Sequence, residues 1–278
     1  MLNWFPGHMN AARRAIREAM PKIDLVIEVL DARIPFSSEN PLVAELRGDR
    51  QCIQILNKAD LADPEVTAAW LARLDAREGL LAMTHQQHQP TLNQRMLRRV
   101  RALVPPKPSR PVMAMILGIP NVGKSTLINA LSGRTIAVTG NKPAITRHQQ
   151  RVAVGRDLVL WDTPGFLWPR LSPPACGYRL AVTGAISDRV VEAQDIAEFA
   201  VGFLVERYPD RLIHHFRLTD LPSEGNAAVL EAIGRRRGYL RKGGVVDLER
   251  AANALLKDLG AGSLGRISLE TPADCVSS

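Results

Sequence analysis

The sequence predicts an α/β fold with a mostly parallel sheet and helices on both faces, followed by a smaller all-helical part. Short apolar runs of strand length alternate with helical segments from the start of the chain to about residue 170. Such alternation is typical of parallel strands joined by helices that cover both faces of the sheet. Beyond about residue 175 the strand patterns stop and only helical patterns follow. We therefore expect two domains, at 1–172 and at 173–278.

Each expected element follows from its local pattern. Apolar runs next to turn-forming residues predict strands at 24–30, 52–56, 80–83, 112–117, 152–154 and 158–161. Helical patterns cover 10–20, 39–46, 64–77, 92–103 and 124–131, and then 193–207, 210–218, 227–237 and 248–259. Asn10 is suited to cap the first helix. Four prolines within 105–111 predict a stiff surface connector, and 169–174 is expected to be a loop.

Composition narrows the possible functions. The chain has 278 residues, of which 46% are hydrophobic, so it can bury a substantial core. A net charge of +8 favours an anionic partner such as nucleic acid, although a basic enzyme surface is also compatible with it. The cysteines Cys52, Cys176 and Cys275 are scattered, which predicts no disulfide-linked partner, no zinc site and a reducing cytoplasmic location. No apolar run has transmembrane length and no secretory signal is recognisable, so we expect no membrane partner.

Residues 118–125, with the sequence Gly-Ile-Pro-Asn-Val-Gly-Lys-Ser, match the phosphate-binding P-loop pattern between an apolar strand and a helix. Glycines let backbone N–H groups point at phosphate oxygens beside a helix N-terminus. Lys124 is predicted to contact the outer phosphates during catalysis, and Ser125 to ligate Mg²⁺. The nucleotide is expected to contact Asn121, Val122, Gly123, Lys124, Ser125 and Thr126.

A second motif, Asp162-Thr-Pro-Gly165, follows the strand predicted at 158–161. A carboxylate there lies on the Mg²⁺ side of a P-loop site, so Asp162 is a predicted metal ligand. The Gly165 N–H is expected to bond the terminal phosphate. The polar loop between the two motifs should supply a threonine that ligates Mg²⁺ and senses that phosphate. Thr146 is the candidate for this catalytic role, with Thr139 and Thr135 as alternatives, and an ordinary solvent-exposed loop is the competing interpretation.

The base is expected to be guanine. Asn57-Lys58-Ala59-Asp60 follows a predicted buried strand, and the Asp60 carboxylate can accept hydrogen bonds from guanine N1–H and its exocyclic amine. Adenine presents no such pair of donors. Asn57 would bond the base edge or brace the P-loop, and the Lys58 stem would stack on the ring. Because this motif precedes the P-loop, the sequence predicts a circularly permuted P-loop GTPase domain that binds GTP and GDP.

The ordered motifs resemble the YlqF-type ribosome-biogenesis GTPases. The resemblance includes Trp4-Phe-Pro-Gly-His-Met9, Asp31-Ala-Arg-Ile-Pro35, and the segments 180–186 and 241–247, so it covers nearly the whole chain. It implies a bacterial cytoplasmic protein that acts in late assembly of the large ribosomal subunit through a C-terminal RNA-binding domain. Ala144 departs from a usual glycine. Thr84 stands in a loop that usually backs the guanine, so it is a weak candidate for that contact.

Hydrolysis needs an unusual activating group. Phe166 and Leu167 occupy the position after Asp-x-x-Gly where Ras-like enzymes carry a glutamine, and an apolar side chain cannot orient water. His8 is a catalytic candidate, with a structural turn or an RNA contact as alternatives. The resemblance implies that Asn121 ligates K⁺ beside the phosphates, unless it only bonds the loop backbone.

The remaining patterns leave the partner open. The run 235–242 has five cations and Tyr239, which favours gripping RNA phosphate and stacking a base, although a solvated helix end is the alternative. The histidines at 85, 88, 148, 214 and 215 lack metal-ligand spacing and are expected at the surface or in loops. A switch acting on a protein effector is the alternative function to ribosomal RNA binding. The chain is expected to be a monomer.

Overall fold

The computed structural model describes residues 7–86, 91–105, 110–135, 150–186 and 192–275, with side-chain placement from residue 11 onward. The chain divides into two compact units. The first comprises Met1–Leu171 together with Glu270–Ser278, and the second comprises Ser172–Leu269.

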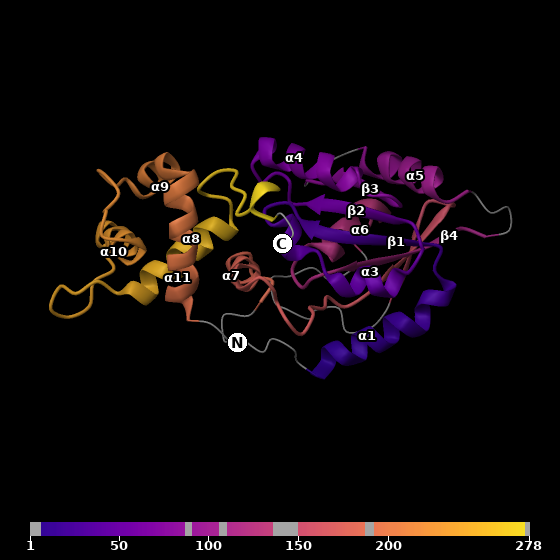
Figure 1. The fold of residues 1–278 in the computed structure, drawn as a ribbon, viewed down its shortest axis with the longest axis horizontal. Coiled ribbons are helices and arrows are strands. Elements are labelled where there is room, and N and C mark those ends of the chain that lie inside the picture. Colours follow the sequence, from indigo (N-terminus) through magenta and orange to yellow (C-terminus); the bar gives the residue numbers. More distant parts are fainter. Residues whose placement is uncertain (1–6, 87–90, 106–109, 136–149, 187–191, 276–278) are drawn as a thin grey trace. The chain divides into compact units, whose positions relative to one another are not determined.

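The first unit is built on a six-stranded sheet in the order β3-β2-β1-β4-β6-β5 (Figure 1). All neighbouring strands pair in parallel except β5, which is antiparallel to β6. The expected mostly parallel sheet is therefore confirmed. The strands are β1 (Leu25–Asp31), β2 (Cys52–Asn57), β3 (Leu80–Thr84), β4 (Val112–Gly118), β5 (Gln150–Val154) and β6 (Leu158–Asp162). β1 and β2 are buried along their whole length, as their apolar sequences require.

Helices cover both faces of this sheet (Figure 1). They are α1 (Gly7–Ala19), α2 (Pro35–Ser38), α3 (Pro41–Arg47), α4 (Pro64–Asp75), α5 (Leu92–Leu103) and α6 (Lys124–Ser132). α4 packs against β2 and β3, whereas α6 packs against β4, β5 and β6 and also against α5. Asn40 and Asp63 cap α3 and α4 through their side-chain oxygens. The prediction that Asn10 caps the first helix is wrong, because the helix already begins at Gly7.

The second unit is helical in its described part. Its helices are α7 (Pro174–Val182), α8 (Ala193–Arg207), α9 (Pro209–Phe216), α10 (Asn226–Arg236) and α11 (Leu248–Gly260). α8 contacts the other four, so it forms the centre of the bundle. α7 was not predicted, because the prolines and glycine around it favour a loop; Pro174 instead occupies the first turn, where its missing N–H is tolerated.

The chain returns to the first unit at Glu270. The Glu270 carboxylate is fully buried and accepts hydrogen bonds from the Ser37 N–H at 3.0 Å and the Ser37 hydroxyl at 2.5 Å. Its carbonyl accepts from Trp70 Nε1, and Arg73 donates to the carbonyls of Pro272 and Cys275. The expected range of the helical domain, 173–278, thus differs from the structure in its last residues. Sequence periodicity carries no signal for a short extended segment that packs on a distant helix.

Candidate nucleotide site

The site lies at the carboxyl edge of the parallel strands. Strand register pairs Asp31 at the end of β1 with Asn57 at the end of β2. On the other side, Val29 of β1 pairs with Gly118, and Ile116 of β4 pairs with Asp162. Motifs from the two halves of the chain therefore meet at one edge. Ligands of open α/β sheets bind outside this edge.

The P-loop runs from the end of β4 into the first turn of α6. Gly123 has φ 93°, and a Cβ atom there would lie 2.3 Å from Asn57 Nδ2, so only glycine fits. Lys124 is buried, and its Nζ donates to the carbonyls of Gly118 at 3.2 Å and Ile119 at 2.9 Å. Burial lowers the pKa of Lys124 to about 8, although Asp162 acts in the opposite direction. Ser125 and Thr126 are half-buried at the helix start.

Two side chains of the Asn-Lys-Ala-Asp segment hold the P-loop directly. Asn57 Nδ2 donates to the Val122 carbonyl at 2.7 Å. Lys58 Nζ donates to the Asn121 carbonyl at 2.9 Å. The alternative in which Asn57 braces the P-loop is thus the geometry observed. Both contacts fix the position of the base-recognition segment 57–60 relative to the P-loop.

A buried ion cluster holds Lys58 from the other side. The Asp31 carboxylate accepts from Arg33 Nε at 2.9 Å and from Arg33 Nη2 at 2.7 Å, and its Oδ2 also accepts from Lys58 Nζ at 2.9 Å. Although burial alone would raise it, Arg33 and Lys58 hold the pKa of Asp31 well below its usual range. Asp60 is exposed, and its carboxylate contributes to raising the pKa of Arg33. The cluster therefore places Asp60 beside a fixed cation.

His85 is a site residue that the sequence analysis missed. It lies in the loop after β3, one of the two expected placements, but it is only 2% exposed, and its Nδ1 lies 2.6 Å from Asn57 Oδ1. Because Asn57 Nδ2 donates to Val122, the atom that faces His85 is the acceptor oxygen. His85 Nδ1 therefore carries the proton. Burial lowers the pKa of His85, which favours the neutral ring. The apolar run Leu-Ala-Met before Thr84-His85 is the sequence signal for this placement.

The Asp-Thr-Pro-Gly segment closes the phosphate side. Asp162 is 1% exposed, and its Oδ1 has no hydrogen-bond partner among the described residues. Burial raises the pKa of Asp162, against the effect of Lys124. A buried carboxylate oxygen without a donor is suited to a cation. Gly165 approaches the P-loop so closely that a Cβ there would lie 2.7 Å from Pro120 Cα and 3.0 Å from Lys124 Nζ.

Several predicted site residues remain predictions. Thr146 and Thr139 lie outside the described residues, and Thr135 is exposed just before that segment. His8 is in the first turn of α1, and its side chain lies outside the described part. Thr84 ends β3, half-buried, directly before His85. Asn121 has φ 55°, a left-handed conformation that Asn tolerates better than most residues.

The arrangement defines a class of protein. A P-loop, an Asp-x-x-Gly segment and an Asn-Lys-x-Asp segment at one sheet edge, with the last of these first in the chain, make this a circularly permuted P-loop GTPase. A family model described as "50S ribosome-binding GTPase" matches residues 113–234. Ribosome biogenesis GTPase A of Priestia megaterium is 42% identical over 98% of both chains.

Two solved structures of YlqF proteins resemble this chain over nearly its whole length. YlqF from T. maritima with bound GNP is 27% identical, with a TM-score of 0.68 over 95% of this chain and 99% of that one. A GDP-bound YlqF structure is 28% identical, with the same TM-score over 94% of this chain and 100% of that one. The chain belongs to the ribosome biogenesis GTPase A family. It binds guanine nucleotide and hydrolyses GTP. In the part of the chain that the structure describes, no helix is long and apolar enough to span a bilayer.

Proposed function

We propose that this GTPase is a cytoplasmic assembly factor for the large ribosomal subunit, that it acts as a monomer and that its nucleotide state controls its binding to ribosomal RNA. The name of the relatives and the description of the matching family support this role. The net charge of +8 fits an RNA partner.

The contact of the Gly165 segment with the P-loop supports control by nucleotide state. Gly165 is packed against Pro120 and Lys124, and Phe166 N–H donates to the Gly118 carbonyl at 3.4 Å. The chain that leaves this contact runs through Leu171 into the helical unit. A change at the terminal phosphate that moves Gly165 therefore has a short covalent path to that unit. Asn40 anchors the same segment, since its Nδ2 donates to the Phe166 carbonyl at 3.0 Å.

The residues of the phosphate site fit Mg²⁺. Asp162 offers a buried oxygen that has no donor among the described residues, and Ser125 is the second residue of α6, next to Lys124. Asp162 and Ser125 would hold the ion together with Thr146, and the ion would supply positive charge to the outer phosphate oxygens. The Lys124 ammonium, already held between two P-loop carbonyls, supplies a second charge. Asp60 selects guanine, with Asn57 and Lys58 setting its position.

The water-activating group lies outside the apolar segment after Gly165. Phe166 and Leu167 are 0% and 2% exposed, so neither side chain reaches a water in the site. His8 is proposed to polarise the attacking water. Asn121 is proposed to hold K⁺ against the phosphates, where the cation would replace the charge of an arginine finger.

The run 235–242 is proposed to contact RNA, but most of its arginines already face acids. Arg235 pairs with Glu231, Arg237 with Asp258, and Arg241 with Asp247. Such exposed pairs are weak and can exchange for phosphate. Arg250 covers the Tyr239 ring at 4.5 Å, so stacking of a base there is restricted to the other ring face. The contact is therefore mainly electrostatic.

The direct test is GTP turnover by the full chain with purified large subunits, with purified small subunits and with neither, in K⁺ and in Na⁺. We expect stimulation by large subunits alone, and faster turnover in K⁺. Equal turnover in all three conditions would contradict the ribosomal role. It would favour the alternative, a switch that acts on a protein effector. Loss of the K⁺ effect in Asn121→Ala would support the cation site, and an unchanged ratio would overturn it.

A further inference from the structure

Helix α5 in the GTPase unit is the most one-sidedly basic element of the described chain that the nucleotide site does not use. Its sequence, Leu-Asn-Gln-Arg-Met-Leu-Arg-Arg-Val-Arg-Ala-Leu, contains four arginines and no acidic residue. The arginines are Arg95, Arg98, Arg99 and Arg101. They span about one and two-thirds turns, a rise of roughly 9 Å.

Packing leaves these arginines facing outward. Leu92, Met96 and Val100 are each at most 1% exposed, so they form the buried stripe of the helix. The helix packs against α6 along its buried side. Arg98 and Arg101 are exposed, and Arg95 and Arg99 are half-buried. Helical spacing places the four on one continuous arc next to the buried stripe.

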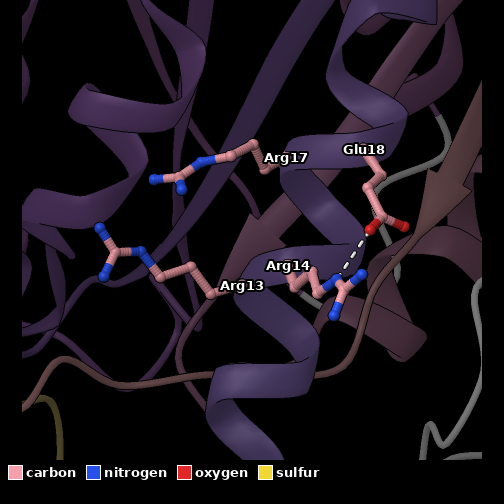
Figure 2. Close-up of a pocket in the computed structure, with 4 residues that line it drawn as sticks. All are labelled: Arg13, Arg14, Arg17 and Glu18. Carbon is pink, nitrogen blue, oxygen red and sulfur yellow. Dashed lines mark hydrogen bonds and ion pairs between the residues drawn. The ribbon is translucent and has the colours of Figure 1, made fainter.

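Part of the charge of α5 has no acidic partner among the described residues. Arg101 pairs with Asp157, whereas Arg98 and Arg99 make no ion pair with any residue that the structure describes. On α1, by contrast, the arginines pair with acidic side chains. Figure 2 shows a surface hollow on that helix lined by Arg13, Arg14, Arg17 and Glu18, with Arg14 bonded to Glu18.

Arg13 and Arg17 of that hollow share Glu45, at 2.8 and 3.2 Å. The cations of the hollow thus all face a carboxylate, as do most arginines in 235–241. α5 therefore presents two adjacent arginines, Arg98 and Arg99, that pair with no acid among the described residues.

We propose that α5 is a second RNA-binding surface, on the GTPase unit itself, and that Arg98 and Arg99 grip backbone phosphates. The inference rests on the proposed binding to ribosomal RNA. Four arginines without a lysine favour phosphate, because the planar guanidinium donates two parallel hydrogen bonds to phosphate oxygens. The arc carries no exposed large apolar residue, which disfavours a membrane surface and an acidic protein partner with an apolar centre.

The experiment compares the full chain with Arg98→Gln/Arg99→Gln and with a control, Arg14→Gln/Lys22→Gln. The control removes the same charge from exposed positions of the same unit. Binding is measured by cosedimentation with purified large subunits, and by fluorescence anisotropy with a labelled RNA hairpin across a salt series. Anionic vesicles and polyglutamate serve as the other anionic probes. GTP affinity, measured in parallel, is expected to stay at the parental value because neither Arg98 nor Arg99 belongs to the nucleotide site.

We expect the α5 variant to bind hairpin and subunit on the order of tenfold more weakly, with a salt slope reduced by about 1.5. The control should bind within about twofold of the parental chain. If the α5 variant binds the hairpin as tightly as the parental chain does, the proposal that α5 binds RNA is wrong, whatever the subunit result. A parental chain that binds the hairpin but not the subunit would instead overturn the proposed ribosomal role. If the α5 variant loses more affinity for vesicles or polyglutamate than for RNA, α5 binds one of those partners instead, and the inference is contradicted.

Discussion

Asn57 donates its side-chain amide to the carbonyl of Val122 at 2.7 Å, joining residues that are 65 positions apart in the chain. This bond connects the guanine-recognition segment to the P-loop although the first precedes the second. The contact is possible because β2 and β4 both pair with β1 in the same sheet. Permutation has changed the order of the motifs along the chain and left their meeting point at the carboxyl edge intact.

Asp60→Asn is expected to shift the base preference of the site from guanine towards xanthine. The amide replaces one acceptor oxygen with a donor, so guanine loses a hydrogen bond and xanthine gains one. GTP affinity should fall by at least about tenfold, and XTP affinity should rise. The measurement is a titration with labelled GTP and XTP. An unchanged ratio of the two dissociation constants would show that Asp60 does not face the base.

His85→Ala should weaken GTP binding through Asn57. Loss of the Nδ1 donor leaves the Asn57 oxygen buried without its partner, which costs on the order of 1–3 kcal/mol. We expect a rise in the GTP dissociation constant of about tenfold or more and a smaller ratio of GTP to ATP affinity. His85→Gln retains an N–H donor and should recover part of the affinity. His214→Ala, an exposed position, is the control. Parental GTP affinity and discrimination in His85→Ala would rule out this positioning role.

His8→Ala should lower turnover and leave GTP binding nearly unchanged. A group that polarises the attacking water acts on the transition state, so kcat should fall on the order of a hundredfold while KM stays the same. The assay is steady-state hydrolysis on purified large subunits. Parental turnover in His8→Ala would exclude the histidine from catalysis.

The buried Glu28 carboxyl is expected to make the stability of the folded chain depend on pH. Burial raises the pKa of this carboxyl from 4.5 to about 7, with a contribution from Glu39, although Gln54 and Asn40 donate hydrogen bonds to it. The folded chain therefore holds the Glu28 proton more tightly than the unfolded chain. This contribution to stability is fully present below about pH 4.5 and is lost as the pH rises through about 7.

Glu28→Gln removes this titration. Relative to the parental chain, the variant should be more stable at about pH 8 than at about pH 5, by up to roughly 3 kcal/mol. Urea unfolding at the two pH values measures the difference. Glu18→Gln, in an exposed helical pair, is the control for the removal of a carboxylate. A constant difference between variant and parental chain would mean that Glu28 is ionised in the fold at both pH values.

The strands and motifs were predictable because their signals are local. A short apolar run followed by Asn-Lys-Ala-Asp or by Gly-x-x-x-x-Gly-Lys-Ser specifies both an element and its end. Three features escaped prediction because each depends on contacts distant in sequence. His85 is buried by its contact with Asn57, Glu270 by Ser37, and α7 forms although its prolines favour a loop. Asp31 and Arg33 were recognised as part of a motif, but only the structure shows that they hold Lys58.

The central claim is that nucleotide state controls binding to the large ribosomal subunit. Cosedimentation of the full chain with purified large subunits tests it, with a non-hydrolysable GTP analogue, with GDP and without nucleotide, across a salt series. We predict the tightest binding with the GTP analogue, with affinity falling steeply as salt rises. Neutralising Arg235, Arg236, Arg237 and Arg241 together should weaken that binding and flatten the salt dependence while GTP affinity stays parental. Equal binding in all three nucleotide states would contradict the account.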